Sequence, residues 1–421
     1  MIYKKFYICF IFIYLLLYPV LVNVFDIWFG VSANKVLAVC LLFFLFINVK
    51  KLRKKFFRDF VFLFFLYLFM HEVVVLLTAN SSLSILLSNC TTFLIFLCIT
   101  LFSGYILTTD YPYIIKIIRF CCVVIWLSIF IEMLGYGDIF LFHYEVKLRE
   151  GLGFYQMHGL YPIANALSNE LLNLNILLYI LSPPNYFLKA NNVLIIVTQV
   201  RAAIVSMIGI LLIRSSYKKN VVVMFCLALF VLSCYPYIKD NGLFQNTLYE
   251  LGVDKSYYVE DTYRHHYLNG ALNALADYPF FGVGLDRLSL SSHWEKDAFY
   301  FHYLYNLPTQ IPGTYNTAEL STSDSGLTLI GEMGGVGIVM ICVLYFNFIY
   351  LSIKLNCKKY LYVVIQHFVY MYSAPSWLFN VFFSFPFWFL YGILIFKKYN
   401  NLAFLHKKSK LSKNYWLANQ H

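Results

Sequence analysis

Charged residues are scarce in this sequence of 421 residues, where Asp, Glu, Lys and Arg together make up only 13%. Soluble domains carry about 25% charged residues, so this composition excludes an ordinary soluble globular protein. Hydrophobic residues account for 61% of the chain, and the mean hydropathy is +0.68. We therefore expect an all-α polytopic membrane protein whose apolar surface faces lipid.

Sequence motifs for disulfide, metal and nucleotide chemistry are also missing. The ten cysteines lie in or beside apolar runs, and no C-x-x-C pair occurs. This distribution is typical of buried structural thiols. The sequence contains no P-loop, so we expect no nucleotide, metal or other cofactor. The net charge of +11 indicates basic cytoplasmic loops and contact with membrane lipid, and no nucleic acid as a partner.

Apolar runs of about 20 residues, the length that crosses a bilayer, recur along the chain. They predict spanning helices at 6–25, 33–49, 59–78, 84–107, 114–135, 160–181, 221–238, 325–353, 360–374 and 378–396. The first run is too long for the core of a signal peptide and has no small-residue cleavage site after it, so we interpret it as a spanning helix. One further run, at 191–213, contains Arg201.

The position of Arg201 decides the predicted topology, because an arginine at the bilayer centre costs roughly 2.5–3.5 kcal/mol or more. If its run is one straight helix with a snorkelling arginine, the basic clusters at 50–58 and 214–220 fall on opposite sides of the membrane. If the chain turns at Arg201 between two short helices, roughly 186–200 and 202–213, all strong basic clusters are cytoplasmic. We favour the turn, which places Arg201 toward the outer face.

The turn gives about twelve transmembrane helices with both termini cytoplasmic. It divides the chain into an N-terminal transmembrane bundle of about nine crossings, a large periplasmic loop with short amphipathic helices, C-terminal transmembrane helices and a basic cytoplasmic tail. The boundaries of these parts are 1–238, 239–322, 323–400 and 401–421. The richness in Phe, Tyr, Ile, Asn and Lys is typical of an AT-rich bacterial gene, so we expect a multi-pass protein of the bacterial inner (plasma) membrane.

The large loop is dense in aromatic residues, as in "SYYVEDTYRHHY". Aromatic rings beside polar groups suit the binding of sugar rings and equally suit a membrane interface. Leu268, Leu272 and Leu275 are spaced as on one face of a short amphipathic helix. Pro279 should end this helix, and "FFGVG" should follow as a tight turn.

The first turn of this helix carries Arg264, His265 and His266. Adjacent histidines point about 100° apart on a helix, which is poor geometry for chelating one metal ion. We therefore expect no metal site here.

The next spanning helix begins in "TSDSGLTLIGEMGGVG", where Asp324 is a suitable N-cap. Gly331, Gly334, Gly335 and Gly337 form a small-residue face for close packing. Glu332 follows within the membrane, where a carboxylate is a functional candidate by default; a buried partner to an arginine is the alternative.

The loop "HYEVKLREGLGFYQMHGLYPIANAL" at 143–167 carries Arg149 before two glycines, and Asn165 after Pro162. Irregular backbone beside an arginine predicts close approach to a ligand.

Together these features resemble the superfamily of O-antigen polymerases and O-antigen ligases. "REGLGFYQMHGLYPIANA" is similar to the family's R-x-x-G-x-x-x-x-P-N region, and "TQVRAA" to its S-R-x-x motif, with Val200 in place of serine. "YRHHYLNGALNALADYPFFGVG" resembles a stretch that ends in n-P-l-f-G-v-G. "SDSGLTLIGEMGGVG" has the spacing of the ligase pattern H-[NSQ]-x9-G-x-x-G, but Ser323 replaces its histidine, which favours the polymerase branch.

The resemblance implies a glycosyltransferase that polymerises surface polysaccharide. Its substrates would be undecaprenyl-diphosphate-linked oligosaccharide repeat units at the outer face, and a chain-length-regulating co-polymerase is an expected partner. Arginine suits a lipid diphosphate because its planar fork makes bidentate contacts and stays charged. The catalytic candidates are therefore Arg201 and Arg264, with Asp324, Glu332, His265 or His266 as a general base. The substrate-binding candidates are Arg149, Arg201, Arg264, His265, Tyr263 and Asn165.

Two alternative functions remain open at this point. An O-antigen ligase would have the same fold and transfer glycan to lipid A–core, against which Ser323 argues. A lipid-linked oligosaccharide flippase would also carry intramembrane cations, but such transporters show two homologous halves, and no internal repeat is visible in the sequence.

Overall fold

The structure, a computed structural model, describes residues 13, 14, 17, 33–48, 59–78, 83–106, 111–136, 160, 164–181, 186–198, 200–214, 263–285, 329–373, 378 and 384–399. This part of the chain is almost entirely helical and contains no β-strand, so the all-α prediction is confirmed for it. The helices are α3 (Ala33–Asn48), α4 (Phe60–Thr78), α5 (Leu83–Ile106), α6 (Tyr111–Ile131), η3 (Glu132–Tyr136), α7 (Ala164–Leu181), α8 (Tyr186–Val197), α9 (Arg201–Arg214), α12 (Tyr263–Asp277), α15 (Leu329–Lys354), η9 (Lys358–Tyr360) and α16 (Leu361–Ser373), followed by a helix over 384–399.

Four of these helices are long and apolar enough to cross a membrane, namely Phe60–Leu77, Leu86–Ser103, Tyr113–Tyr136 and Leu329–Lys354. Helices suit such sequences because every backbone polar group is bonded within the segment, where lipid offers no partner. The protein is therefore a membrane-embedded helical bundle. The total of about twelve spans stays a prediction, and the expected spans at 6–25 and 221–238 lie outside the described residues apart from 13, 14 and 17.

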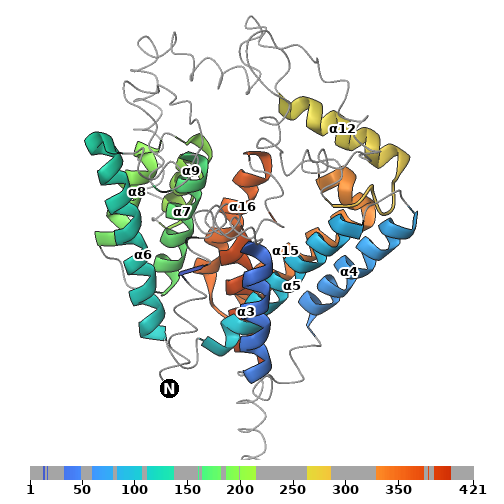
Figure 1. The fold of residues 1–421 in the computed structure, drawn as a ribbon, viewed down its shortest axis with the longest axis horizontal. Helices are drawn as coiled ribbons and strands as arrows, with labels where there is room; N and C mark the ends of the chain where they lie inside the picture. The colour runs from blue at the N-terminus through green and yellow to red at the C-terminus, as the bar shows by residue number, and fades with distance from the viewer. Residues whose placement is uncertain are drawn as a thin grey trace, which may run out of the picture.

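Figure 1 shows two groups of helices with α16 between them. In one group α5 packs against both α3 and α4, and α12 lies along the beginning of α15. In the other group α7 is packed against α6, α8 and α9, while α9 packs on α16. Side chains of α7 are buried over the whole range 166–179, so this helix is central and faces lipid on no side.

Basic side chains gather where α15 ends and α4 begins. Lys398 donates to the buried Asp59 at 2.6 Å, and Nζ of Lys397 lies 3.3 Å from Sγ of Cys357. Lys354, Lys358 and Lys359 belong to the same region of α15 and η9. We call this the basic end of the bundle. Figure 1 places α12 at the opposite end.

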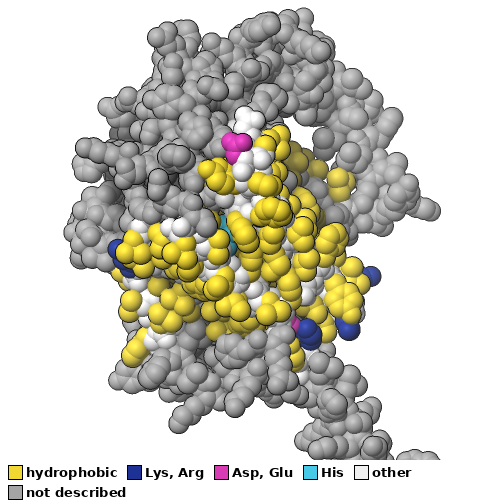
Figure 2. All heavy atoms as spheres, turned by 90° about the vertical axis from the view of Figure 1, so that its right-hand side faces the viewer, with side chains coloured by type: hydrophobic (Ala, Val, Ile, Leu, Met, Phe, Trp, Pro, Cys, Tyr) yellow, Lys and Arg dark blue, Asp and Glu magenta, His cyan; other side chains and the backbone are white. Residues whose placement is uncertain are grey.

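An apolar surface extends between the two ends. Exposed hydrophobic residues follow one side of α4 and one side of α15, namely Leu63, Leu66, Met70, Val73, Leu77, Val336, Val339, Val343, Phe346, Tyr350 and Ile353. Figure 2 shows this face as a nearly continuous hydrophobic area, with Lys and Arg side chains at its edges, most of them at the lower right. A surface of this kind is expected to face lipid chains.

The core beside this face is built around Trp388 of the helix 384–399. Its ring packs on Phe64, Phe65 and Phe96, with ring centroids 6.2, 5.0 and 5.3 Å away. The same helix approaches α5 so closely that a Cβ on Gly392 would overlap the carbonyl oxygen of Thr100. Aromatic packing and a small residue at a helix contact are what membrane interiors use in place of a hydrophobic driving force.

Candidate functional site

The run around Arg201 is folded as two short helices, which confirms that part of the prediction. Helix α8 ends at Val197 and α9 begins at Arg201. The amide of Ile204 donates to the carbonyl of Val200 at 3.1 Å, which closes the first turn of α9. The side chain of Arg201 lies outside the described part, so the structure fixes the position of its backbone only.

Contacts along α7, α8 and α16 show that the chain reverses direction at this break. Helix α16 starts directly after η9, at the basic end. Tyr179 of α7 packs on Tyr362 with ring centroids 6.0 Å apart. Gln366 donates to Asn173 at 2.7 Å. Residue numbers fall on α7 while they rise on α16, so α7 runs toward the basic end and α8, joined to α7 by 182–185, runs away from it.

Helix α9 returns toward the basic end. A Cβ on Gly209 would lie 3.1 Å from Cγ2 of Ile365, so this part of α9 is back beside the start of α16. On α8, Asn192 accepts a hydrogen bond from Asn175 of α7 at 2.8 Å. Asn192 therefore lies at a depth in the bundle similar to that of Gly209. Arg201 lies midway along the chain between these positions, so it occupies the vertex farthest from the basic end.

The predicted amphipathic helix is present as α12, with its end at Asp277 before Pro279. Its packing differs from the expectation in one respect. Ala271 and Ala274 are fully buried, while Leu272 is 45% exposed. The small residues face inward because α12 lies close along α15, and the leucine lies outside.

The turn that follows α12 interlocks with the beginning of α15 through the backbone. The amides of Val283 and Gly284 donate to the carbonyls of Gly331 and Glu332 at 3.1 and 2.8 Å. In the other direction, the amides of Gly335 and Val336 donate to the carbonyls of Pro279 and Phe280 at 2.8 and 3.1 Å. Two segments about fifty residues apart in the sequence thus share their backbone hydrogen bonds.

Two glycines with positive φ make this contact feasible. Gly334 (φ 64, ψ −176) breaks the helical path of α15 and frees its backbone for the turn. Gly282 has φ 63, and a Cβ there would overlap the carbonyl oxygens of Gly331 and Glu332. The predicted close packing of the glycine motif is confirmed, although Gly334 meets a turn rather than another helix.

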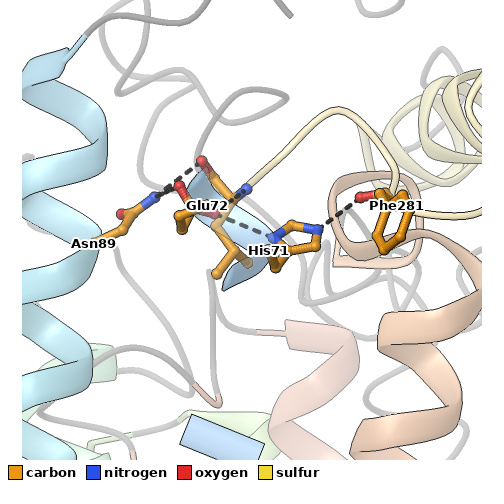
Figure 3. A network of polar contacts seen from close by, with 5 residues as sticks. His71, Glu72, Asn89 and Phe281 are labelled. Atoms are coloured by element: carbon orange, nitrogen blue, oxygen red, sulfur yellow. Dashed lines mark hydrogen bonds and ion pairs between the residues drawn. The ribbon is translucent and has the colours of Figure 1, made fainter. Parts of the chain in front are cut away.

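Buried polar side chains of α4 and α5 hold the same turn from the opposite side (Figure 3). Nε2 of His71 donates to the carbonyl oxygen of Phe281 at 2.7 Å. Glu72 accepts from the amide of Leu285 at 3.3 Å and from Nδ2 of Asn89 at 3.1 Å. Asn89 also donates to the carbonyl of Leu285 at 3.3 Å.

His71 and Glu72 also lie against each other, with Nδ1 3.4 Å from Oε1 and both side chains fully buried. We call His71, Glu72 and Asn89 the clasp. The clasp was not predicted from the sequence, although two adjacent ionisable residues in the apolar run "FMHEVVV" were a signal for it.

A second buried polar cluster links α7 to α16. Nε2 of Gln366 donates to Oδ1 of both Asn169 and Asn173, at 2.9 and 2.7 Å. Asn173 lies 3.5 Å from Oε2 of Glu170, and all four side chains are almost fully buried. From the sequence this stretch was predicted only as a spanning helix, although "SNELLNLN" has too many polar residues for a lipid-facing helix.

The other predicted site residues are placed only in part. Asn165 lies in the first turn of α7, and Tyr263, Arg264, His265 and His266 lie in the first turn of α12, with side chains outside the described part. Glu332 is buried at the first turn of α15.

Two predicted site residues, Arg149 and Asp324, lie outside the described residues altogether. Among the residues that the structure does describe, no group of three His, Cys, Asp or Glu side chains could hold a metal ion.

Comparison with known proteins adds no family to these observations. The sequence matches no protein-family model, and no curated protein matches it significantly. What the fold and geometry define is therefore a class: a helical membrane protein with an arginine at a helix break and a helix held over one end of the bundle.

Proposed function

We propose that this protein is a polymerase of surface polysaccharide, of the O-antigen polymerase type. It would transfer the growing glycan from undecaprenyl diphosphate to a sugar hydroxyl of the next lipid-linked repeat unit, at the outer face of the bacterial inner membrane. The observation that carries the proposal is the position of Arg201 as the first residue of α9, at the vertex of two short helices inside an apolar bundle.

A permanent cation at this position calls for an anion. The first turn of a helix already carries about half a positive elementary charge, so an added arginine is unfavourable there unless something negative binds. In a low-dielectric surrounding the need is stronger, because unpaired charge is costly. A lipid diphosphate, which reaches the protein from the bilayer, supplies two adjacent anionic groups that arginine binds in a bidentate manner.

The held position of α12 supports the same proposal. Arg264 belongs to its first turn, and the turn after α12 is fixed by α15 and by the clasp. An arginine on a rigid helix can be held, before the reaction starts, near the position where negative charge develops on the leaving diphosphate. Such preorganised charge stabilises the transition state more than the ground state.

Arg201→Ala and Arg264→Ala are the direct tests in the host strain. Each variant should lose long polysaccharide while its membrane level stays normal, because removal of one charged donor at a reacting anion costs about 10²–10³-fold in rate. The surface polysaccharide is separated on a gel, with Lys189→Ala as the matched control at the far end of α8. A normal ladder from both arginine variants would overturn the proposal.

Deletion of the gene separates the rival functions. A ladder that collapses to core plus one repeat unit indicates a polymerase, since single units are still flipped and ligated. Bare core with long polymer on the lipid carrier indicates a ligase. Bare core with no units in the outer leaflet indicates a flippase.

A further inference from the structure

Glu170 is a buried acidic residue that the fold does not explain. Its side chain is 1% exposed, and Oε1 has no hydrogen-bond partner among the residues that the structure describes. Oε2 has a single long contact, 3.5 Å from Nδ2 of Asn173. A buried carboxyl group that lacks partners costs several kcal/mol or more, so a residue kept only for packing would be apolar here.

The surrounding carboxamides hold Glu170 in a defined place. Gln366 donates both of its Nε2 hydrogens, one to Asn169 and one to Asn173. This arrangement fixes Asn173, and Asn173 in turn lies against Oε2 of Glu170. Oε1 of Gln366 and Nδ2 of Asn169 are also buried with no partner in the described part of the chain. Among the described residues, the cluster thus offers two unpartnered acceptors and one unpartnered donor, all on buried side chains.

The register of the helices places Glu170 at nearly the same depth as the backbone of Arg201. Asn175 of α7 and Asn192 of α8 are bonded to each other. Glu170 on α7 and Val197, the last residue of α8, each lie about one and a half helical turns farther from the basic end than this asparagine pair. Arg201 follows after a three-residue break. Glu170 and the backbone of Arg201 therefore lie at neighbouring depths of one helix group.

We infer that Glu170 is the general base of the proposed glycan transfer, an inference that rests on the proposed function. The hydroxyl oxygen of the acceptor sugar attacks C1 of the donor glycan. The bond from C1 to the diphosphate oxygen breaks, and the electron pair leaves with the diphosphate. Oε1 of Glu170 takes the hydroxyl proton and later releases it to water. The step balances without metal, nucleotide or redox partner.

The role of the carboxamides follows from this assignment. Asn173 and Gln366 are positioning residues, because they orient the carboxylate and have no part in proton transfer themselves. Free polar atoms on Gln366 and Asn169 are suited to the hydroxyls of a sugar, which both donate and accept hydrogen bonds.

Glu170→Gln tests the inference in full-length protein reconstituted in nanodiscs. The probe is the lipid-linked repeat unit extracted from the deletion strain. Glutamine preserves the shape of the side chain but takes no proton at neutral pH. We expect kcat to fall about 10²–10⁴-fold, the usual contribution of a general base, with KM for the lipid-linked unit and the melting temperature nearly unchanged. Glu132→Gln, on η3 at the end of α6, is the matched carboxylate control.

The outcomes separate this inference from the proposed function. If wild-type protein does not extend the lipid-linked units, the proposed function fails. If wild-type protein extends them and Glu170→Gln keeps kcat within about threefold, the inference fails and the function stands. If the glutamine variant unfolds, Glu170→Asp is the second test. Aspartate is one methylene shorter, so its carboxylate would no longer reach the acceptor hydroxyl, and a folded aspartate variant with undiminished kcat would contradict the inference.

Discussion

At the scale of single residues, Gly282 and Gly334 determine how the turn after α12 meets α15. Both have positive φ. A Cβ on Gly282 would overlap the carbonyl oxygens of Gly331 and Glu332, and a Cβ on Gly334 would overlap the amide nitrogen of Gly282 and the carbonyl oxygen of Phe280. Any side chain at either position would therefore meet backbone, which cannot rotate away. The spacing of these glycines was visible in the sequence, but the identity of the partner was not, because a glycine face packs equally well on a helix or on a turn.

Gly282→Ala should destabilise the protein far more than Gly135→Ala. Both residues have positive φ, 63 and 85, but a Cβ on Gly135 meets nothing within 4 Å. The Gly135 variant should lose only the conformational cost of about 1–2 kcal/mol, whereas the Gly282 variant also suffers overpacking of about 1–3 kcal/mol or more. Thermal melting in detergent measures both. Equal melting temperatures would contradict the interlock of the turn with α15.

Residues that carry charge differ in how far the sequence alone reveals them. Arg201 could be recognised because its cost in an apolar run demands a break or a purpose. His71, Glu72 and Glu170 were equally recognisable as ionisable residues in apolar runs, yet their roles depend on partners far along the chain. His71 contacts Phe281, and Gln366 bonds to Asn173, which lies beside Glu170. No local pattern specifies such pairs.

At the scale of elements, the reversal between α8 and α9 is the feature that the sequence predicted best. Charge bias favoured a turn of the chain at Arg201 over a single straight helix, and the contacts of Gly209 and Asn192 agree with the turn. The exact break was less predictable: α8 ends at Val197, three residues before the expected end at 200. Boundaries depend on capping and tertiary contacts that a hydropathy pattern does not contain.

Reporter fusions should detect this reversal in cells. Alkaline phosphatase, which folds only in the periplasm, should be active when fused after Thr198 and inactive when fused after Arg214. A fusion after Leu181, at the end of α7, is the control and should be inactive, because α7 ends toward the basic end. Activity after both Leu181 and Arg214 would show that the basic end is not cytoplasmic.

At the scale of the whole molecule, one end of the described bundle is basic and the other carries α12. Basic residues at helix ends favour the cytoplasmic side, so the structure supports an orientation with α12 outside. The tether between Lys398 and Asp59 joins the end of the helix 384–399 to the start of α4. The sequence predicted the basic clusters, but not that they would meet through a buried carboxylate.

Loss of the Lys398 side chain should weaken this end of the molecule. Asp59 is 1% exposed and its other oxygen has no partner in the described part, so Lys398→Ala leaves a poorly compensated buried acid. We expect a loss of about 1–3 kcal/mol in unfolding free energy, measured by denaturant titration in mixed micelles. Adding Asp59→Asn to the same variant should recover part of the loss. A double variant less stable than the single one would contradict the pairing.

The clasp has a consequence for the order of events during synthesis. His71 and Phe281 are separated by 210 residues in the sequence, and Glu72 and Leu285 by 213. At roughly 5–20 residues per second, α4 and α5 emerge from the ribosome some 10–40 s before the turn that they hold. During that interval the clasp lacks its contacts with Phe281 and Leu285. The three polar side chains of the clasp are therefore synthesised well before the turn that completes their hydrogen bonds.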